Sequence, residues 1–440
     1  MDFGALASSF GGLTWAVLAF IVALSIIVAI HEYGHYIVGR WCGIDADVFS
    51  LGFGPVIWSR PDKHGTVWQI AALPFGGYVK FRGDANAASV GADTDIPAAR
   101  NTMQGAPLWA RAATVAAGPI FNFILSFLIF AGVLMFQGQA KDPLTIGQLR
   151  ALPTMVDGVQ PGDELVAING TAIPPLEEFS DFADALPIAA TLDYTIRRDG
   201  AELTVDGPYP YPPHVLSLQP SSAAYDVGMK QGDVILAIDG TPISAFSELR
   251  DKVVASDGKP LLLRVWRDGD EIDIALAPRR VDLPMGDGSF ETRWLIGITG
   301  GLFFEAETAS PGLWASMKYG VTQTIFIIRS SLSGLWNIIT GAISSCNISG
   351  PIGIAQASGA MASQGASSFI WFIAVLSTAV GLLNLFPVPV LDGGHLVFHA
   401  YEAVTGKPPS DRALRILMTI GLALIGSLMV FAITNDLFCP

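Results

Sequence analysis

Four long stretches of this chain are apolar and nearly free of charge, and they restrict its fold more than any other feature. A helix of ~20 apolar residues crosses a bilayer core of about 30 Å. Charged residues make up only 15% of the 440 residues, whereas soluble domains carry roughly 25%. We therefore predict a polytopic α-helical membrane protein with about four transmembrane helices. The four stretches are Thr14–Tyr36, Ala112–Phe136, Ser368–Phe386 and Ile416–Thr434.

Lysine and arginine in short loops predict the orientation of such helices, because cytoplasmic loops are enriched in them. Residues 38–107 hold six lysine and arginine residues and the loop before the fourth stretch holds Lys407, Arg412 and Arg415, whereas residues 1–13 and 435–440 contain neither lysine nor arginine. We expect both termini, and the long segment between the second and third stretches, to lie outside the cytoplasm, in a multi-pass membrane protein. No basic residue precedes the first stretch, so we expect it to be retained rather than cleaved as a signal peptide.

Charge and cysteine content exclude two classes of function. The net charge is −14, which disfavours nucleic acid as a partner and leaves the lipid bilayer as the expected surroundings. The three cysteines, Cys42, Cys346 and Cys439, are far apart in the sequence. We therefore expect no disulfide framework and no paired-cysteine metal site.

The segment between the second and third apolar stretches contains an internal repeat. VQPGDELVAINGTAI at 159–173 matches MKQGDVILAIDGTPI at 229–243, and each copy holds an Asn-Gly or Asp-Gly dipeptide typical of hairpin turns. We predict two similar β-rich domains at 140–212 and 213–300. The membrane parts are then 1–137 and 367–440, joined to the second domain by a helical linker at 301–366.

The linker contains apolar residues spaced three and four apart from Pro311 to Ser345, which predicts a helix with one apolar face. We favour an amphipathic helix in the membrane interface. Two alternatives stay open: a pair of helices broken near Ser333-Gly334, and a fifth span that would place the later termini on the other side.

The first apolar stretch ends in the sequence His31-Glu32-Tyr33-Gly34-His35. Residues i and i+4 share one face of a helix, so both imidazoles can bind one metal ion. Glu32 lies beside them and can take a proton from water. A chance occurrence of this short motif is the alternative, but ionisable side chains at membrane depth are expensive and usually functional.

Catalytic zinc sites use three protein ligands and one open position, so a third ligand is needed. The nearest downstream candidates are Asp45, Asp47 and His64, which read as loop residues. Asp392 is the better candidate, because it lies in NLFPVPVLDGGH (384–395), where prolines interrupt the third apolar stretch. Irregular backbone at membrane depth is tolerated only inside protein or beside a watery cavity.

HEYGH together with NLFPVPVLDGGH resembles the site-2 protease family of intramembrane zinc metalloproteases. The resemblance covers nearly the whole chain, because SLGFGPVIWSR (50–60), ALPFGGYVKF (72–81) and RAATVAAGPIFNF (111–123) also look like segments of this family. The two repeats resemble the PDZ domains of bacterial proteases. The implied fold is a site-2 protease fold with a membrane-associated β-hairpin and two extracytoplasmic PDZ-like domains.

The resemblance also implies roles for individual residues. One Zn²⁺ would be held by His31, His35 and Asp392, with Glu32 as general base and His395 outside the ligand set. Asn384 would hold the substrate or steady the oxyanion, although a structural bond at the helix break is the alternative. Gly52, Phe53 and Gly54 would mark a hairpin that pairs with an unwound substrate, or one that merely closes the cytoplasmic face. Residues expected to shape the site are Gly118, Pro119, Asn122, Pro387, Pro389, Gly393 and Gly394.

The implied function is regulated intramembrane proteolysis by a zinc metalloendopeptidase. Its substrates would be single-span membrane proteins of the anti-sigma factor type, and remnant signal peptides, after an earlier extracytoplasmic cut. The PDZ-like domains would bind a peptide or protein, or act as spacers. Two other classes remain as alternatives: a catalytically inactive membrane PDZ scaffold, and a metal-dependent hydrolase of a lipid-soluble small molecule.

Overall fold

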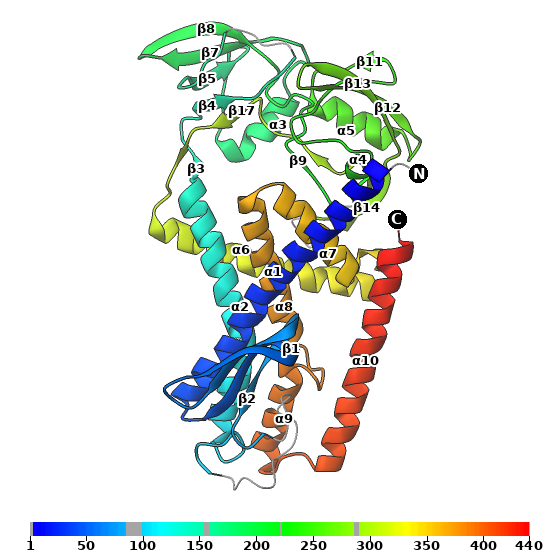
Figure 1. Cartoon of the computed structure of the whole chain (residues 1–440). Coiled ribbons are helices and arrows are strands. Elements are labelled where there is room, and N and C mark those ends of the chain that lie inside the picture. Colours follow the sequence, from blue (N-terminus) through cyan, green and yellow to red (C-terminus); the bar gives the residue numbers. More distant parts are fainter. Residues whose placement is uncertain (1–2, 85–98, 154–157, 221, 286–289, 440) are drawn as a thin grey trace. The chain divides into compact units, whose positions relative to one another are not determined.

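The structure, a computed structural model, describes residues 3–84, 99–153, 158–220, 222–285 and 290–439 (Figure 1). These residues divide into two compact units. The helical unit comprises residues 1–133, 315–339 and 345–439, and the β-rich unit comprises residues 134–314 and 340–344. Each unit is described by itself.

The helical unit confirms a long apolar helix at each of the four predicted stretches. Within the described residues, four helices are long and apolar enough to cross a membrane, namely α1, α2, α8 and α10. The least buried of them is α10, where large apolar side chains such as Leu422 and Val430 are exposed. Such side chains suit lipid rather than water. The helices of this unit are α1 (Phe3–Trp41), α2 (Leu108–Gln137), α6 (Leu313–Ile339), η2 (Ser345–Asn347), α7 (Pro351–Ser363), α8 (Ala366–Asn384), α9 (Asp392–Thr405) and α10 (Asp411–Phe438).

Helix α6 runs crosswise to the long helices of its unit (Figure 1). Its buried residues are Ser316, Gly320, Thr324 and Ile327, and a Cβ atom at Gly320 would lie 2.5 Å from Phe127 O of α2. The predicted apolar stripe lies elsewhere on the helix, and its members Val321 and Ile325 are exposed. Helix α6 therefore packs on the protein mainly through small residues and through Ile327, which lies in a core cluster with Phe130 of α2.

A folded hairpin follows α1 and forms a small sheet from β1 (Ala46–Pro61) and β2 (Val67–Phe81). Because both strands bend, residues 48–51 pair with residues 77–80 on one side and with 67–70 on the other. Residues 67–71 also pair with 56–61, so that segments 56–61 and 77–81 form the two edges of the sheet.

The turn of this hairpin is bound to α1 through Asp62. Tyr36 Oη of α1 and Trp68 Nε1 donate hydrogen bonds to Asp62 Oδ2 at 2.8 and 3.2 Å, and the backbone N–H groups of His64 and Thr66 donate to Oδ1. Burial alone would raise the pKa of Asp62, but these donors outweigh it and lower the pKa to about 2. The hairpin is thus anchored to the last turns of the helix that carries HEYGH.

The prediction that the cysteines form no disulfide is wrong, because Cys346 is bonded to Cys439. The two cysteines are separated by 93 positions in the sequence. The chain between them includes α7 to α10, and the end of α10 returns to the start of α7. There the Asp436 carboxylate accepts hydrogen bonds from the backbone N–H groups of Gly350, Ile352 and Gly353. Tertiary structure therefore brings together two cysteines whose spacing gives no signal. Cys42 is free and buried.

The β-rich unit contains two copies of one four-stranded antiparallel sheet, as the internal repeat predicts. The first has strand order β6-β5-β7-β8 and the second β11-β10-β12-β13. Arg198 binds Asp163 through Nε and Nη2 in the first copy, and Arg267 binds Asp233 in the same way in the second. The elements of the first copy are β3 (Gln139–Ala140), β4 (Ile146–Leu149), β5 (Glu164–Ile168), β6 (Thr171–Ala172), η1 (Leu176–Glu178), α3 (Phe179–Asp184), β7 (Leu192–Arg198) and β8 (Ala201–Gly207).

The chain that follows the second copy returns to the first. Strand β16 pairs with β9, but β17 pairs with β4 and β18 pairs with β3. Phe303 and Phe304, next to and within β17, are buried in the core of the first copy. The first copy thus extends into the segment assigned to the linker from the sequence. The remaining elements are β9 (Ser217–Leu218), α4 (Ala223–Asp226), β10 (Val234–Ile238), β11 (Thr241–Pro242), α5 (Phe246–Ala255), β12 (Leu261–Arg267), β13 (Asp270–Leu276), β14 (Arg279–Pro284), β15 (Phe290–Leu295), β16 (Ile298–Thr299), β17 (Phe304–Ala306) and β18 (Thr308–Ala309).

Stability of the β-rich unit is expected to fall in mild acid because of His214. This histidine is 4% exposed, and burial, followed by the nearby Arg150 guanidinium, lowers its pKa to about 4 despite the opposing charge of Asp233. Between pH 6.5 and 4 the unfolded chain therefore binds a proton that the folded unit does not, so stability is lost as the pH falls through this range, by up to about 3 kcal/mol.

Hydrogen exchange of the core amides in the β-rich unit, measured from pH 7 to pH 4, tests this prediction. The His214→Asn variant should be less stable at pH 7 but should lose the part of the pH dependence that His214 contributes. The prediction is contradicted if wild type and variant show parallel pH profiles.

Candidate metal centre

Helix α1 positions the two histidines of HEYGH on one face, and that face is pressed against α2. Gly34 makes the close approach, because a Cβ atom there would lie 2.6 Å from Ala117 O. As a result His31 and His35 are buried, with exposed fractions of 8% and 9%. Their rings lie edge to face with centroids 4.8 Å apart.

Asp392 completes a group of three ligand atoms with these histidines. His31 Nε2 lies 3.2 Å from His35 Nε2, and Asp392 Oδ2 lies 3.1 Å from the first and 3.5 Å from the second. A tetrahedral zinc ion with bonds of about 2.0–2.1 Å needs ligand atoms roughly 3.3 Å apart. Asp392 Oδ2 is also buried and makes no hydrogen bond. The three residues therefore fit a zinc ion, which would satisfy this oxygen.

The chain reaches Asp392 through a break between two helices. Helix α8 ends at Asn384, Pro387 and Pro389 lie in the irregular turn, and α9 begins at Asp392. Gly393 and Gly394 are buried where the turn folds over the start of α9. A Cβ atom at Gly393 would collide with Leu385 O and Phe386 O, and one at Gly394 with Val388 O. Only glycine allows the turn to fold so tightly against the first turn of the helix.

Groups on α2 orient both imidazoles. The Thr114 carbonyl lies 2.9 Å from His35 Nδ1 and accepts its hydrogen, which leaves Nε2 free to bind metal. Asn122 lies 3.2 Å from His31 Nδ1 through Nδ2, and its buried Oδ1 makes no hydrogen bond. Oxygen and nitrogen of an amide are assigned from the hydrogen-bond network. Turning the amide lets Oδ1 accept from His31 Nδ1 and frees Nε2 in the same way.

Gly118 of α2 lies directly against the two histidines of the candidate metal centre. A Cβ atom there would collide with His35 Nε2 and would lie 2.8 Å from His31 Cε1. Because the added methyl group must displace a ligand, Gly118→Ala is expected to weaken zinc binding at least about tenfold, as changes next to metal ligands commonly do. Chelator competition measures this, and Gly132→Ala is the matched control, since its Cβ would meet no atom within 4 Å. Equal zinc affinities in the two variants would contradict the prediction.

Glu32 lies between the histidines and one edge of the β1–β2 sheet. A Cβ atom at Gly77 would lie 3.2 Å from Glu32 Cγ, and the backbone N–H of Val79 donates a hydrogen bond to the Glu32 carboxylate. A cavity of about 800 Å³ opens here, lined by the three ligand residues, Glu32 and the edge residues 77–79. The carboxylate, the ligand atoms and a strand edge thus share one cavity.

Among the other predicted site residues, some line this cavity and others do not. Asn384 lines the cavity, and its Nδ2 donates to Val380 O within α8. Phe53 also lines the cavity and stacks on Tyr78 of the edge segment. Gly52 and Gly54 adopt φ angles of 89° and 83°, which favour glycine. Pro119 lies within α2, and His395 lines the cavity outside the ligand group.

Three contributors to the site were not found from the sequence. Thr114 acts through its backbone carbonyl, which carries no signal in the residue type. Gly77 and Val79 come next to Glu32 only through the bend of the hairpin. The Gly76-Gly77 pair was the one hint in the sequence, because two adjacent glycines allow the backbone of β2 to approach another group closely.

Comparison with known proteins agrees with this geometry. The model of peptidase family M50 matches residues 19–428. A relative from Agrobacterium fabrum, named "Putative zinc metalloprotease", is 37% identical over 436 residues that cover 97% of each chain. The regulator of sigma-E protease RseP from Salmonella typhimurium is 33% identical over 455 residues, 96% of this chain and 98% of that protein. The chain therefore belongs to peptidase family M50, the site-2 protease family, and is a zinc metalloprotease.

Proposed function

We propose that this protease cuts single-span membrane proteins within the bilayer, with His31, His35 and Asp392 as zinc ligands and Glu32 as general base. The observation that carries the proposal is the position of these four residues. Three ligand atoms and a carboxylate converge at the end of an apolar helix, inside a cavity that a strand edge also lines. A protease of soluble chains would not need this site on a membrane helix.

The chemistry follows from the residues around the cavity. Zinc, when bound, supplies Lewis-acid activation of water and of the scissile carbonyl. Glu32 takes the proton from the attacking water and passes it to the leaving amide nitrogen. The Thr114 carbonyl and Asn122 hold the two imidazoles in the tautomers that point Nε2 toward the ion. Asn384, at the end of α8, supplies an amide donor for the substrate carbonyl.

An edge strand can hold a substrate segment in the extended form that cleavage requires. A helix hides its carbonyl groups in i→i−4 hydrogen bonds, so a cleavable segment has to be extended. Segment 77–81 is an edge of the sheet and passes beside Glu32. An unwound segment that adds to this edge as a further strand would bring its backbone to the ligands.

The proposed topology places both termini and the β-rich unit in the periplasm and the metal near the cytoplasmic face. The basic residues of segment 38–107 and of the loop before α10 support it. The Cys346–Cys439 disulfide supports it too, because disulfides persist in oxidising compartments such as the periplasm.

The repeats would act as PDZ domains that select substrates. Both copies have the same sheet order, and PDZ domains bind extended chains by strand addition. We propose that they admit chains already shortened outside the membrane. A substrate of the anti-sigma factor type is suggested by the name of the sigma-E protease relative.

Reconstitution tests the proposal. The purified protein in lipid vesicles with zinc should cleave a single-span anti-sigma factor fragment with a short external end, and mass spectrometry should place the cut within the apolar segment. The same fragment with a folded external domain should be cut slowly. A cut outside the apolar segment, or no cut with zinc bound, would contradict the proposal.

A further inference from the structure

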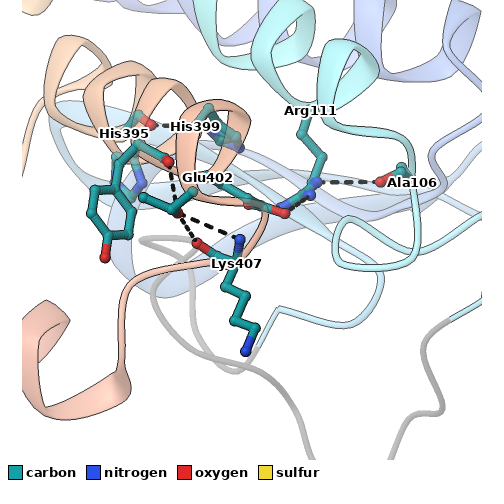
Figure 2. Close-up of polar contacts among 8 residues, drawn as sticks. Ala106, Arg111, His395, His399, Glu402 and Lys407 are labelled. Carbon is teal, nitrogen blue, oxygen red and sulfur yellow. Dashed lines mark hydrogen bonds and ion pairs between the residues drawn. The ribbon is translucent and has the colours of Figure 1, made fainter.

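An ion pair between Arg111 and Glu402 joins two helices of the metal site at a distance from the metal ligands. Arg111 Nη1 donates to Glu402 Oε2 at 3.0 Å and Nη2 donates to Oε1 at 2.6 Å, so the pair is bidentate. Each side chain is only 18% exposed. Arg111 Nε also donates to Ala106 O at 3.2 Å, and all three donors of this network are visible in Figure 2.

The two residues belong to the helices that contribute to the metal centre. Arg111 is in the first turn of α2, and the same face of α2 continues through Thr114, Gly118 and Asn122, which contact the histidines. Glu402 is in the last turn of α9, the helix that begins with Asp392. Ten residues of helix place the ion pair about 15 Å from the ligand along α9.

Little else holds the far end of α9. Among the described residues of this helix only Gly393 and Gly394 are buried, and both lie in its first turn. Farther along, Val397, Tyr401 and Val404 are exposed by 49%, 51% and 88%. Leu396, in the second turn, packs against a hydrophobic cluster that includes Ile44. Packing therefore holds the first half of α9, whereas the ion pair holds its last turn.

The direction in which α9 points also depends on this pair. Asp392, His395, His399 and Glu402 are spaced three, four and three residues apart, which places them along one side of the helix, and all four line the cavity of about 800 Å³. A rotation of α9 that moved Glu402 away from Arg111 would therefore also turn Asp392 away from the histidines.

The strength of the pair is sufficient for such a role. Exposed ion pairs contribute little to stability, and the Arg82–Asp45 pair, with side chains 45% and 49% exposed, belongs to that class. A bidentate, partly buried pair is stronger, and removing one partner of a buried pair leaves an uncompensated charge.

We propose that the Arg111–Glu402 ion pair is a positioning device that locks the end of α9 to α2 and so keeps Asp392 opposite His31 and His35. This proposal rests on the zinc site proposed above. It assigns Arg111 and Glu402 no contact with substrate or metal, and it predicts that breaking the pair weakens zinc binding without removing a ligand.

The test measures the zinc dissociation constant of the full-length protein in detergent by chelator competition, together with thermal unfolding of the zinc-free and zinc-loaded forms. Glu402→Gln should weaken zinc binding by about tenfold, the lower end of the range seen when a direct hydrogen-bond partner of a ligand is lost, because the ion pair acts on Asp392 only through α9. The charge swap Arg111→Glu with Glu402→Arg should recover most of the affinity. Lys407→Ala is the matched control, because Lys407 is a nearby exposed cation whose side chain points away from the pair in Figure 2, and it should change nothing.

The neutral double variant Arg111→Gln with Glu402→Gln serves if a single variant fails to fold, because it leaves no unpaired charge, and it should also weaken zinc binding. Unchanged zinc affinity in the folded variants overturns the proposal. So does an equal drop in the unfolding temperature of the zinc-free and zinc-loaded forms at constant affinity, since that would mark a general stabilising role. If wild type and His35→Ala bind zinc alike, the zinc site itself fails, and that outcome is distinct from the other two.

Discussion

Glu32→Gln is expected to lower the rate of peptide cleavage by about 10²–10⁴-fold while leaving zinc bound, because general-base catalysis commonly contributes that much. Glutamine keeps the shape of the side chain but cannot accept the proton of the attacking water. The three ligand atoms lie on His31, His35 and Asp392, so the substitution removes no ligand. Single-turnover cleavage of a reconstituted single-span fragment measures the rate, and metal analysis of the same sample measures zinc.

A matched control for this variant is Glu307→Gln, which removes the carboxylate of an exposed ion pair with Lys141 in the β-rich unit. It should cleave at the wild-type rate. Cleavage by the Glu32→Gln protein at more than a few per cent of the wild-type rate would contradict the assignment of Glu32. Loss of zinc together with activity would show that Glu32 supports the metal instead of the proton transfer.

Asp392→Ala is expected to weaken zinc binding by more than about 100-fold. This loss exceeds the usual effect of changing a residue that only hydrogen-bonds a ligand. Its Oδ2 atom lies 3.1 Å from His31 Nε2 and has no hydrogen-bond donor, so the alanine variant leaves two ligands and no compensating bond. Chelator competition on the purified protein measures the loss, and cleavage should be undetectable at zinc concentrations that saturate the wild type.

His395→Gln is the matched control for the ligand assignment. This imidazole lies one turn beyond Asp392 and lines the same cavity, but it is outside the group of three ligand atoms. The zinc dissociation constant of the His395→Gln variant should lie within about threefold of the wild-type value, since no ligand is lost. The assignment of Asp392 would be wrong if His395→Gln lost zinc while Asp392→Ala kept it.

Much of the fold could be predicted because it depends on local patterns. The apolar stretches are long enough to identify four spanning helices without any tertiary information. The repeat at an offset of 70 residues identified two copies of one sheet, since the same turns and strands recur in both. The linker helix α6 was also predicted. Its apolar stripe did not reveal which face packs on protein, because apolar side chains are stable in contact with lipid as well as in a protein core.

The cysteines show where pattern-based prediction failed. Cys346 and Cys439 lie in no motif, and they meet because Asn435 and Asp436 near the end of α10 bind the segment that leads into α7. The strands β17 and β18 are a second case. They follow the second repeat in sequence, yet they pair with the first, because a returning chain can complete an open sheet edge from far away.

The sequence by itself determined the chemistry of the centre, because HEYGH puts two imidazoles and a carboxylate on one helix by spacing alone, and the proline break marks Asp392 as the acid to join them. The tertiary structure decided how these groups are held. The Thr114 carbonyl behind His35, the edge residue Gly77 beside Glu32 and the Arg111–Glu402 pair all join residues separated by tens to hundreds of positions. Such contacts depend on helix packing and backbone approach, which no short pattern encodes.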